Sequence, residues 1–185
     1  DLGSEAGCAG CVASAARALG GLDGLVHSAG IWGDGPIATL PAAALEETFR
    51  VNTFSAFYLV REALPFLGRD RRGSVVFIGS TAGLRGEAGH SHYAASKGAL
   101  QSLAMSLAVE LAPQTRVNVV SPGWTRTPIA AEAIARIGPA VAGVLPNRRL
   151  GEVEDVVHAV LYLVSEASGH VVGENLCVSG GALLI

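Results

Sequence analysis

Charged residues are scarce in this sequence, where they make up 16% of 185 residues, against 50% apolar residues. A disordered chain would show the reverse balance, so we expect a compact protein with one domain over residues 1–185. The formal net charge is −3 and no basic stripe is present, so nucleic acid is not an expected partner. No apolar run approaches the roughly 18 residues of a membrane helix, so no membrane partner is expected.

Cysteine is also scarce. Three cysteines cannot form an even disulfide framework. Cys8-x-x-Cys11 resembles half of a zinc or redox site, but no second pair or suitably spaced histidine follows it. We therefore expect Cys8 and Cys11 on a helix of small residues, with no metal. We interpret His90 and His92 as loop residues that lead into Tyr93, rather than as a metal pair.

Helical and strand patterns alternate along the sequence. They predict helices near residues 4–19, from Pro41 to about Leu67 with Thr39 near the cap, at 92–112, and after Gly151. Short apolar runs predict strands at 25–27, 74–78, 116–120 and 176–178. This alternation indicates an α/β fold with right-handed crossovers and a parallel sheet covered on both faces. Residues 126–147, which include three prolines, are expected to form a mobile substrate flap.

Many of the 24 glycines follow the predicted strands, as in Ser28-Ala29-Gly30, Pro122-Gly123 and Gly180-Gly181. Glycine at such places allows a tight turn or a close approach of the backbone to a ligand. Because ligands of parallel α/β sheets bind at the carboxyl ends of the strands, we expect a binding site along this edge.

Tyr93 and Lys97 are four residues apart on a predicted helix, so their side chains share one face. A phenol has an unperturbed pKa of about 10, and a nearby ammonium favours the phenolate and lowers that pKa. The pair is therefore a candidate proton relay, with Tyr93 as acid or base and Lys97 as the group that tunes it. Taken alone, this spacing is common in helices and is weak evidence.

Asn52 falls on the otherwise apolar stripe of the helix that begins at Pro41. A buried amide needs hydrogen-bond partners, so Asn52 has either a functional role or a structural bond to a carbonyl or a water.

Ser80 follows a buried strand directly, and we expect its hydroxyl to emerge at the carboxyl end of that strand. It lacks the Gly-x-Ser-x-Gly elbow of a nucleophile, so it is either a turn serine or a donor to a substrate oxygen.

Together these residues resemble the short-chain dehydrogenase/reductase family. Five elements match in order and spacing: Ser28-Ala29-Gly30, Asn52, Ser80, Tyr93-x-x-x-Lys97 and Pro122-Gly123-x-x-x-Thr127. The resemblance extends over essentially all 185 residues. It implies a Rossmann-like, doubly wound parallel sheet in a three-layer α/β/α arrangement. It also implies hydride transfer between NAD or NADP and a small-molecule alcohol or carbonyl substrate.

The family also suggests the role of each matched residue. Tyr93 resembles the general acid/base, Ser80 the residue that holds the substrate oxygen, and Lys97 the group that binds the nicotinamide ribose. Asn52 is similar to the helix asparagine that anchors a water linking the lysine to solvent.

The matched turns imply where the cofactor and the substrate bind. Ser28, Ala29 and Gly30 resemble a turn beside the cofactor, and Pro122, Gly123 and Thr127 resemble the turn that contacts the nicotinamide carboxamide. Asp1-Leu2 is a weaker match to a pair that lies against adenine. Trp124, residues 84–92 and the 126–147 flap are expected to line an apolar substrate pocket, with Arg85, Glu87, Arg126, His90 and His92 as polar options.

The sequence departs from the family pattern at its start. It begins with Asp1 and has its only methionine at position 105, and the Gly-rich phosphate turn and the residue that selects NAD or NADP are not in it. We expect a βαβ unit, a further helix and a strand upstream, about 50–60 residues in all. Either they exist and are disordered without cofactor, or the chain is truncated, or it is a naturally shortened relative.

Two functions therefore remain open. The main prediction is a cytoplasmic NAD(P)-dependent oxidoreductase, and the alternative is a non-catalytic binding or scaffold protein of the same fold. A serine hydrolase ranks low because the elbow is missing. Members of the short-chain dehydrogenase/reductase family commonly form homotetramers or homodimers. We expect small residues such as Ala104 and Ala108 to lie on the outside of their helix and to suit such an interface.

Overall fold

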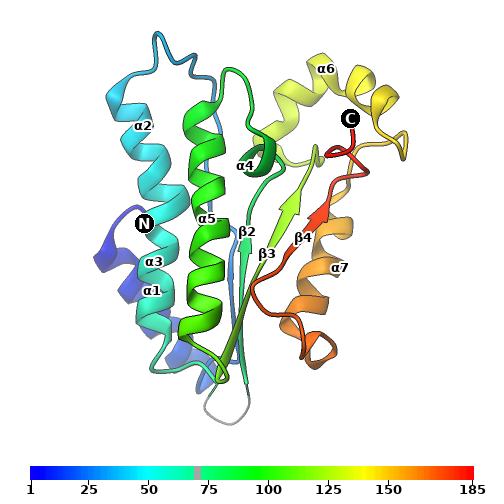
Figure 1. Cartoon of the computed structure of the whole chain (residues 1–185). Coiled ribbons are helices and arrows are strands. Elements are labelled where there is room, and N and C mark those ends of the chain that lie inside the picture. Colours follow the sequence, from blue (N-terminus) through cyan, green and yellow to red (C-terminus); the bar gives the residue numbers. More distant parts are fainter. Residues whose placement is uncertain (69–71) are drawn as a thin grey trace.

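The computed structural model describes residues 1–68 and 72–185. Four parallel strands form one sheet in the order β1-β2-β3-β4 (Figure 1). All four predicted strands are confirmed. Their bounds are β1 (Gly24–His27), β2 (Gly73–Ile78), β3 (Thr115–Pro122) and β4 (Asn175–Val178).

Helices cover both faces of this sheet, so the fold is the Rossmann-like α/β arrangement that the sequence predicts (Figure 1). One face carries α1 (Glu5–Leu19), α3 (Ser55–Ala63) and α5 (Ser91–Glu110), and the other carries α7 (Val153–Val164). Helix α2 (Ala42–Phe49) and the π-helical turn η1 (Arg50–Phe54) lead directly into α3 and lie beside α5. The remaining elements lie in the connections between strands and longer helices: α4 (Ala82–Arg85), η2 (Pro128–Ala130), α6 (Ala131–Val144) and η3 (Glu166–Ser168).

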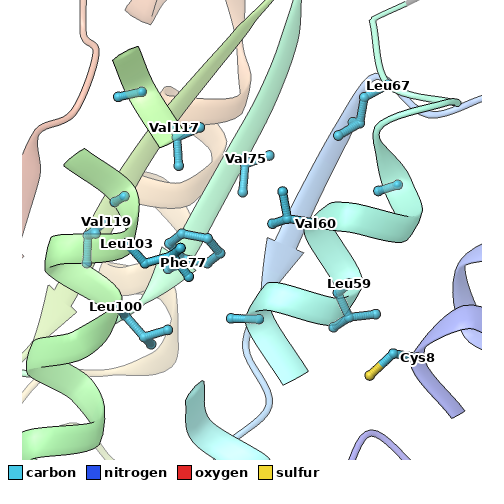
Figure 2. Close-up of a cluster of buried hydrophobic side chains, with 14 of the residues drawn as sticks. Cys8, Leu59, Val60, Leu67, Val75, Phe77, Leu100, Leu103, Val117 and Val119 are labelled. Atoms are coloured by element: carbon cyan, nitrogen blue, oxygen red, sulfur yellow. The ribbon is translucent and has the colours of Figure 1, made fainter. Parts of the chain in front are cut away.

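Strand β2 is buried on both faces, as its continuous apolar run predicts. Val75 and Phe77 point into the cluster formed with α1, α3 and α5 (Figure 2). Val76 points the other way, into a smaller cluster with Ala159 and Leu163 of α7. Because successive side chains alternate across a strand, one six-residue strand joins both cores.

The last crossover has the opposite hand to the first two. The strands follow one another across the sheet in chain order, and α3 and α5 connect them on one face. The connection from β3 to β4 also leads to the next strand in the same direction across the sheet, but its helix α7 lies on the other face. The expectation of right-handed crossovers throughout is therefore wrong for one of the three connections.

A buried arginine fastens α7 to the sheet. Arg116 at the start of β3 is 3% exposed, and its guanidinium donates to the backbone oxygens of Leu163 and Ser165 and to the Ser168 hydroxyl. Two of these acceptors are carbonyls at the C-terminal end of α7, where the helix dipole favours a cation. Burial lowers the pKa of Arg116, but these bonds satisfy the charge it carries.

The helix after Pro41 differs in detail from the prediction. It begins at Ala42 with Pro41 at the cap position, and Thr39 does not cap it because its hydroxyl bonds to the Pro36 carbonyl. The helical run ends at Ala63, not Leu67, since the chain turns there toward β2. A turn of π-helix at residues 50–54 interrupts it.

Residues 126–147 contain the regular helix α6, which accommodates Pro139 in its interior, and the expectation that they form a mobile substrate flap stays a prediction.

Two other expectations are corrected. His92 is not a loop residue: it is 5% exposed in the first turn of α5, after His90 at the cap position. Ala104 and Ala108 do not face outward, because both pack in the core against the sheet.

Cys8 and Cys11 lie on α1, as predicted, with Cys8 buried and Cys11 exposed. The Ser4 hydroxyl caps this helix by accepting from Gly7, and Gly20 ends it in the left-handed conformation. In the part of the chain that the structure describes, no helix is both long and apolar enough to span a membrane.

We expect Phe77→Ala to lower the free energy of unfolding by about 3–5 kcal/mol, because it opens a cavity where β2 meets α3 and α5. Urea unfolding at fixed protein concentration measures this. Leu19→Ala, at a side chain 75% exposed, is the control and should change stability by about 0.5 kcal/mol or less. Equal effects of the two substitutions would contradict this position of the core.

Candidate functional site

A cavity of about 550 Å³ lies at the carboxyl ends of β1, β2 and β3. The turns after these strands contribute Ser28 and Gly30, Gly79 and Ser80, and Pro122 to Thr125. Helix α5 contributes Tyr93 and Lys97. The edge predicted from the glycine-containing turns is therefore the edge that holds the cavity.

Tyr93 is partly covered at the N-terminal end of α5, and its phenol forms a hydrogen bond with Ser80 at the end of β2. Burial raises the pKa of Tyr93, the Ser80 bond opposes this, and the negative charge of Glu87 adds to it. The expected downward shift of the Tyr93 pKa is therefore not found. Lys97 Nζ lies 6.0 Å from the centre of the tyrosine ring, and its charge does not contribute to this shift of the pKa.

Lys97 is the only lysine in the sequence. It is 6% exposed, and its Nζ donates to the Ile78 carbonyl at the end of β2, at 2.8 Å. Burial lowers the pKa of Lys97 to about 8. An ammonium has three donors, and no second acceptor is found for Nζ among residues 1–68 and 72–185. The cavity wall therefore carries a cation with free hydrogen-bonding capacity.

Asn52 lies in the π-helical turn and is fully buried. Its amide oxygen accepts from Ile31 N at 2.7 Å, and its Nδ2 donates to Ile31 O at 2.9 Å and to Ser96 Oγ at 3.0 Å. Both Nδ2 hydrogens are thus used by the protein. The π turn brings Asn52 and its neighbour Thr53 inward together, and Thr53 bonds to the Ser96 carbonyl of α5.

Close backbone contacts bring these side chains together. A Cβ on Gly83 of α4 would lie 2.7 Å from Gly98 N and 2.8 Å from the Lys97 carbonyl carbon, so only glycine lets α4 lie this close to α5. This contact places Ser80, just before α4, beside Tyr93. A Cβ on Gly30 would lie 3.2 Å from Lys97 Nζ and 3.3 Å from Asn52 Oδ1. Gly30 thus leaves the space around the ammonium clear.

His27 is a buried polar residue behind this wall, at the end of β1. Its Nε2 lies 2.7 Å from Ser55 Oγ, and Ser55 in turn donates to the Val51 carbonyl of the π turn. Burial and the charge of Lys97 lower the pKa of His27 to about 4, so the ring is neutral at pH 7. His27 therefore ties β1 to the turn that holds Asn52 without adding a charge.

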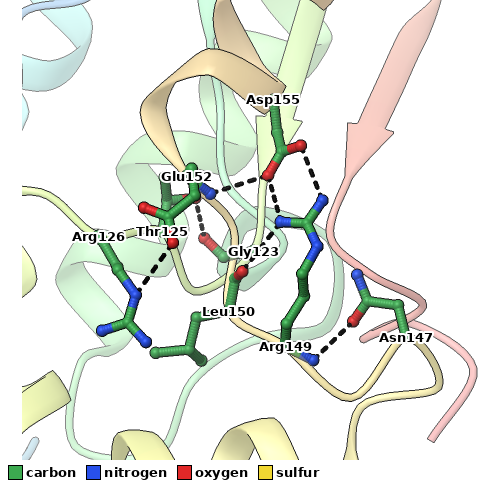
Figure 3. Close-up of polar contacts among 8 residues, drawn as sticks. All are labelled: Gly123, Thr125, Arg126, Asn147, Arg149, Leu150, Glu152 and Asp155. Carbon is green, nitrogen blue, oxygen red and sulfur yellow. Dashed lines mark hydrogen bonds and ion pairs between the residues drawn. The ribbon is translucent and has the colours of Figure 1, made fainter.

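The turn after β3 is held from behind by the segment before α7 (Figure 3). Gly151 N donates to the Trp124 carbonyl at 2.8 Å, and Arg126 N donates to the Gly151 carbonyl at 2.9 Å. This short bridge fixes the backbone on both sides of Thr125. It therefore also fixes the path of the turn that carries Trp124 and Thr127 after the end of β3.

An ion pair at the start of α7 holds Gly151 in place (Figure 3). Arg149 donates through two nitrogens to Asp155, at 2.6 and 2.9 Å, while Asp155 also accepts from the backbone N–H of Glu152. Asp155 and Glu152 form a capping box for the helix. The Arg149 and Glu152 bonds hold the pKa of Asp155 well below its usual range.

Most of the predicted site residues converge on the cavity. Ser28, Gly30, Ser80, Tyr93, Lys97, Pro122, Gly123, Trp124 and Thr127 line it, with Asn52 directly behind Gly30. Ala29 lies between two lining residues without lining the cavity itself. Asp1 and Leu2 are away from it: Asp1 bonds to Gly3, and Leu2 packs against the core. Their place beside adenine stays a prediction.

The expected substrate pocket is only partly as predicted. Arg85 and Glu87 line the cavity, but Arg126 pairs with Glu152, and the two histidines are not among the lining residues. Sequence reasoning missed Trp32, and it also missed Val153, Val156 and Val157 of α7. Trp32 follows the Ser-Ala-Gly turn by two residues, and that position was a usable signal.

Comparison with known proteins gives the family. A family model described as Enoyl-(Acyl carrier protein) reductase matches residues 1–182. The chain is 30% identical to 3-oxoacyl-[acyl-carrier-protein] reductase FabG of Thermotoga maritima, over 89% of this chain and 68% of that protein. The chain belongs to the short-chain dehydrogenase/reductase family. This membership places it among oxidoreductases, as the family resemblance of its motifs predicts.

Two further members are similar over nearly the whole chain. A solved short-chain dehydrogenase/reductase from Brucella melitensis, described as glucose/ribitol dehydrogenase, has a TM-score of 0.94 and 38% identity, covering 98% of this chain and 73% of that one. Inactive 2-(S)-hydroxypropyl-CoM dehydrogenase 2 of Xanthobacter autotrophicus is 35% identical, covering 100% of this chain and 84% of that protein.

We expect a single lysine signal with a pKa of about 8 when the protein carries ¹³C at the lysine ε-carbon and is titrated by NMR. Burial is the cause, so the value should return toward 10.5 on unfolding in urea. A native value above 10 would contradict the buried position of Lys97.

We expect Asp155→Asn to lower the melting temperature at pH 7, because it removes the charge that binds Arg149. The pKa of Asp155 is lower in the folded than in the unfolded protein, so its contribution is present above about pH 4 and is lost as the pH falls further. The difference in melting temperature should therefore shrink below pH 4. Glu154→Gln, at an exposed neighbour, is the control, and a difference independent of pH would contradict the ion pair.

Proposed function

We propose that this protein is an NAD(P)-dependent oxidoreductase that interconverts an alcohol and a ketone, with Tyr93 as the proton donor and acceptor. The single observation that carries this proposal is the arrangement in one cavity of a phenol, a hydroxyl bonded to it and a buried ammonium: Tyr93, Ser80 and Lys97. A carbonyl oxygen placed beside the Tyr93 and Ser80 hydroxyls would meet two donors.

The described residues fit the nicotinamide ribose part of such a cofactor. Lys97 offers donors not used by the protein, and ribose hydroxyls are suitable acceptors for them. Gly30 keeps the adjoining space open, and Pro122, Gly123 and Thr127 line the same cavity. When bound, NAD(P)H supplies a hydride to the carbonyl carbon.

When a ketone is reduced, the substrate oxygen needs one proton in addition to the hydride, and Tyr93 supplies it. Its hydroxyl gives a proton to the substrate oxygen as that oxygen gains negative charge, and Ser80 holds the oxygen by a hydrogen bond. Because burial raises the pKa of Tyr93, the phenol is protonated at neutral pH and ready to act as an acid. Alcohol oxidation needs the phenolate, so it should be favoured at higher pH than ketone reduction.

Asn52 acts by positioning. Its amide joins the Ile31 backbone to Ser96 on α5, so it holds the loop after β1 against the helix that carries Tyr93 and Lys97. With both Nδ2 hydrogens used, a water linking Lys97 to solvent would have to bond to an oxygen of this turn, not to the amide nitrogen. The water itself remains part of the proposal.

The alternative is a protein that binds ligands without turnover. One relative of 35% identity is named an inactive dehydrogenase, which is the reason to test this alternative. The intact set of Ser80, Tyr93, Lys97 and Asn52 favours turnover. Measuring turnover and binding of NADH and NADPH on the same preparation separates the two functions, since binding alone is the result expected of the alternative.

We also propose self-association as a dimer or tetramer. Large apolar side chains are exposed on the outer faces of η1, α3 and α5: Phe54, Phe57, Met105 and Val109, which are 46%, 50%, 49% and 83% exposed. Such side chains, not the buried Ala104 and Ala108, would form the interface.

We expect Tyr93→Phe to lower kcat by about 10²–10⁴-fold, because it removes only the hydroxyl that transfers the proton. The melting temperature and the affinity for NADH or NADPH should stay close to wild type. Tyr162→Phe, at a tyrosine 42% exposed on α7, is the matched control and should keep full activity. Near-normal turnover of Tyr93→Phe would remove the role proposed for this residue.

A further inference from the structure

Two tryptophans form an aromatic wall in the cavity. Trp32 comes from the loop after β1 and Trp124 from the turn after β3, and both line the same cavity as Tyr93. Their rings meet edge to face, with centroids 6.1 Å apart and planes at 84°. These are the only tryptophans in the chain, so the protein places its two largest side chains together beside the proposed proton donor.

This wall is held in place before any ligand arrives. Trp32 stacks on His90 with ring centroids 4.6 Å apart, and His90 Nδ1 bonds to the Gly33 carbonyl at 2.8 Å. The Trp124 carbonyl is fixed by Gly151, which the start of α7 positions. Rings that are already ordered lose little conformational entropy on binding.

A carboxylate stands at the edge of the wall. Glu87 Oε2 accepts a long hydrogen bond of 3.4 Å from Trp32 Nε1, and Glu87 also lines the cavity. Within residues 1–68 and 72–185, no cation pairs with the Glu87 carboxylate and no second donor bonds to that carboxylate. Arg85 lines the cavity too, but its NH1 donates to the Ala182 carbonyl at 2.7 Å. Glu87 is therefore an acceptor with unused capacity.

From this juxtaposition we propose that the site selects a cyclic alcohol or ketone that carries a second hydroxyl close to the reacting carbon. The apolar face of a ring packs on Trp32 and Trp124, and the second hydroxyl donates to Glu87. This substrate class rests on the proposed function, because the reacting carbon is the one beside Tyr93. Glu87 and Tyr93 line the same cavity, so one ligand can contact both side chains.

The chemistry of these groups disfavours other classes at this wall. A carboxylate with unused lone pairs repels a phosphate or carboxylate placed directly beside it, while it binds a hydroxyl donor strongly. Flexible linear chains gain less from a fixed aromatic wall than a ring does, since they lose more conformational freedom on binding.

The test compares three alcohols that differ by one feature each: cis-1,2-cyclohexanediol, cyclohexanol and 1,2-hexanediol. With NAD⁺ and NADP⁺, we expect kcat/KM for the cyclic diol to exceed that for either other alcohol by about tenfold, as one hydrogen bond to a charged group allows. Glu87→Gln should reduce the preference over cyclohexanol, and Trp32→Leu the preference over the linear diol. Glu154→Gln, at an exposed carboxylate on α7, should leave both ratios unchanged.

A second measurement does not depend on turnover. All tryptophan fluorescence comes from Trp32 and Trp124, so titration with the cyclic diol should change the emission of the wild type and have a weaker effect on Glu87→Gln. Equal kcat/KM for the three alcohols with no change in emission would overturn the substrate class and leave the oxidoreductase intact. A change in emission with no turnover of any alcohol or its ketone would instead overturn the proposed function and support the binding site.

Discussion

The site is organised around a buried ammonium, that of Lys97. Its hydrogen bond to the Ile78 carbonyl fixes the lysine against the end of β2, and burial lowers its pKa to about 8. A buried cation is costly unless its donors find acceptors, so the two donors left over need a polar ligand or water. The glycines around it, Gly30 and Gly83, allow the backbone of three segments to close on this point. A lysine with these surroundings is suited to bind a ligand as well as to hold the structure together.

The polar side chains behind the cavity join β1, the π turn η1 and helix α5 by hydrogen bonds. Asn52 and Thr53 of the π turn both bond to Ser96 on α5, and His27 bonds through Ser55 to the same turn. On the far side, Arg149 and Asp155 fix the segment that holds Trp124. Loops that carry binding residues are thus braced on both sides by hydrogen bonds that reach rigid helices and strands, as precise positioning requires.

Much of this arrangement follows from patterns that the sequence carries locally. Continuous apolar runs such as Val75 to Ile78 predict buried strands, and parallel strands gather the turns that follow them at one edge. Asn52 was recognisable as a site residue because it interrupts an apolar stripe. Its partners were not predictable, since the bonds to Ile31 and Ser96 join residues 21 and 44 positions away.

Features set by tertiary packing were the ones that sequence patterns missed. The reversed hand of the last crossover depends on which sheet face α7 covers, and a helical stripe does not encode that choice. The orientation of Ala104 and Ala108 and the helix around Pro139 depend in the same way on neighbouring elements. The pKa of Tyr93 rises where its spacing from Lys97 predicted a fall, because burial disfavours the phenolate and Lys97 Nζ, 6.0 Å from the ring centre, does not contribute to the shift.

Direct detection of hydride transfer tests the central claim. NADH and NADPH carrying deuterium at both C4 positions would be incubated with the protein and 2-hydroxycyclohexanone, and the alcohol product analysed by mass spectrometry. Our interpretation predicts one deuterium on the new carbinol carbon with at least one of the two cofactors. Recovery of this ketone, and of cyclohexanone and 1-hydroxyhexan-2-one, unchanged with both cofactors would contradict a hydride-transfer site built around Tyr93 and Lys97.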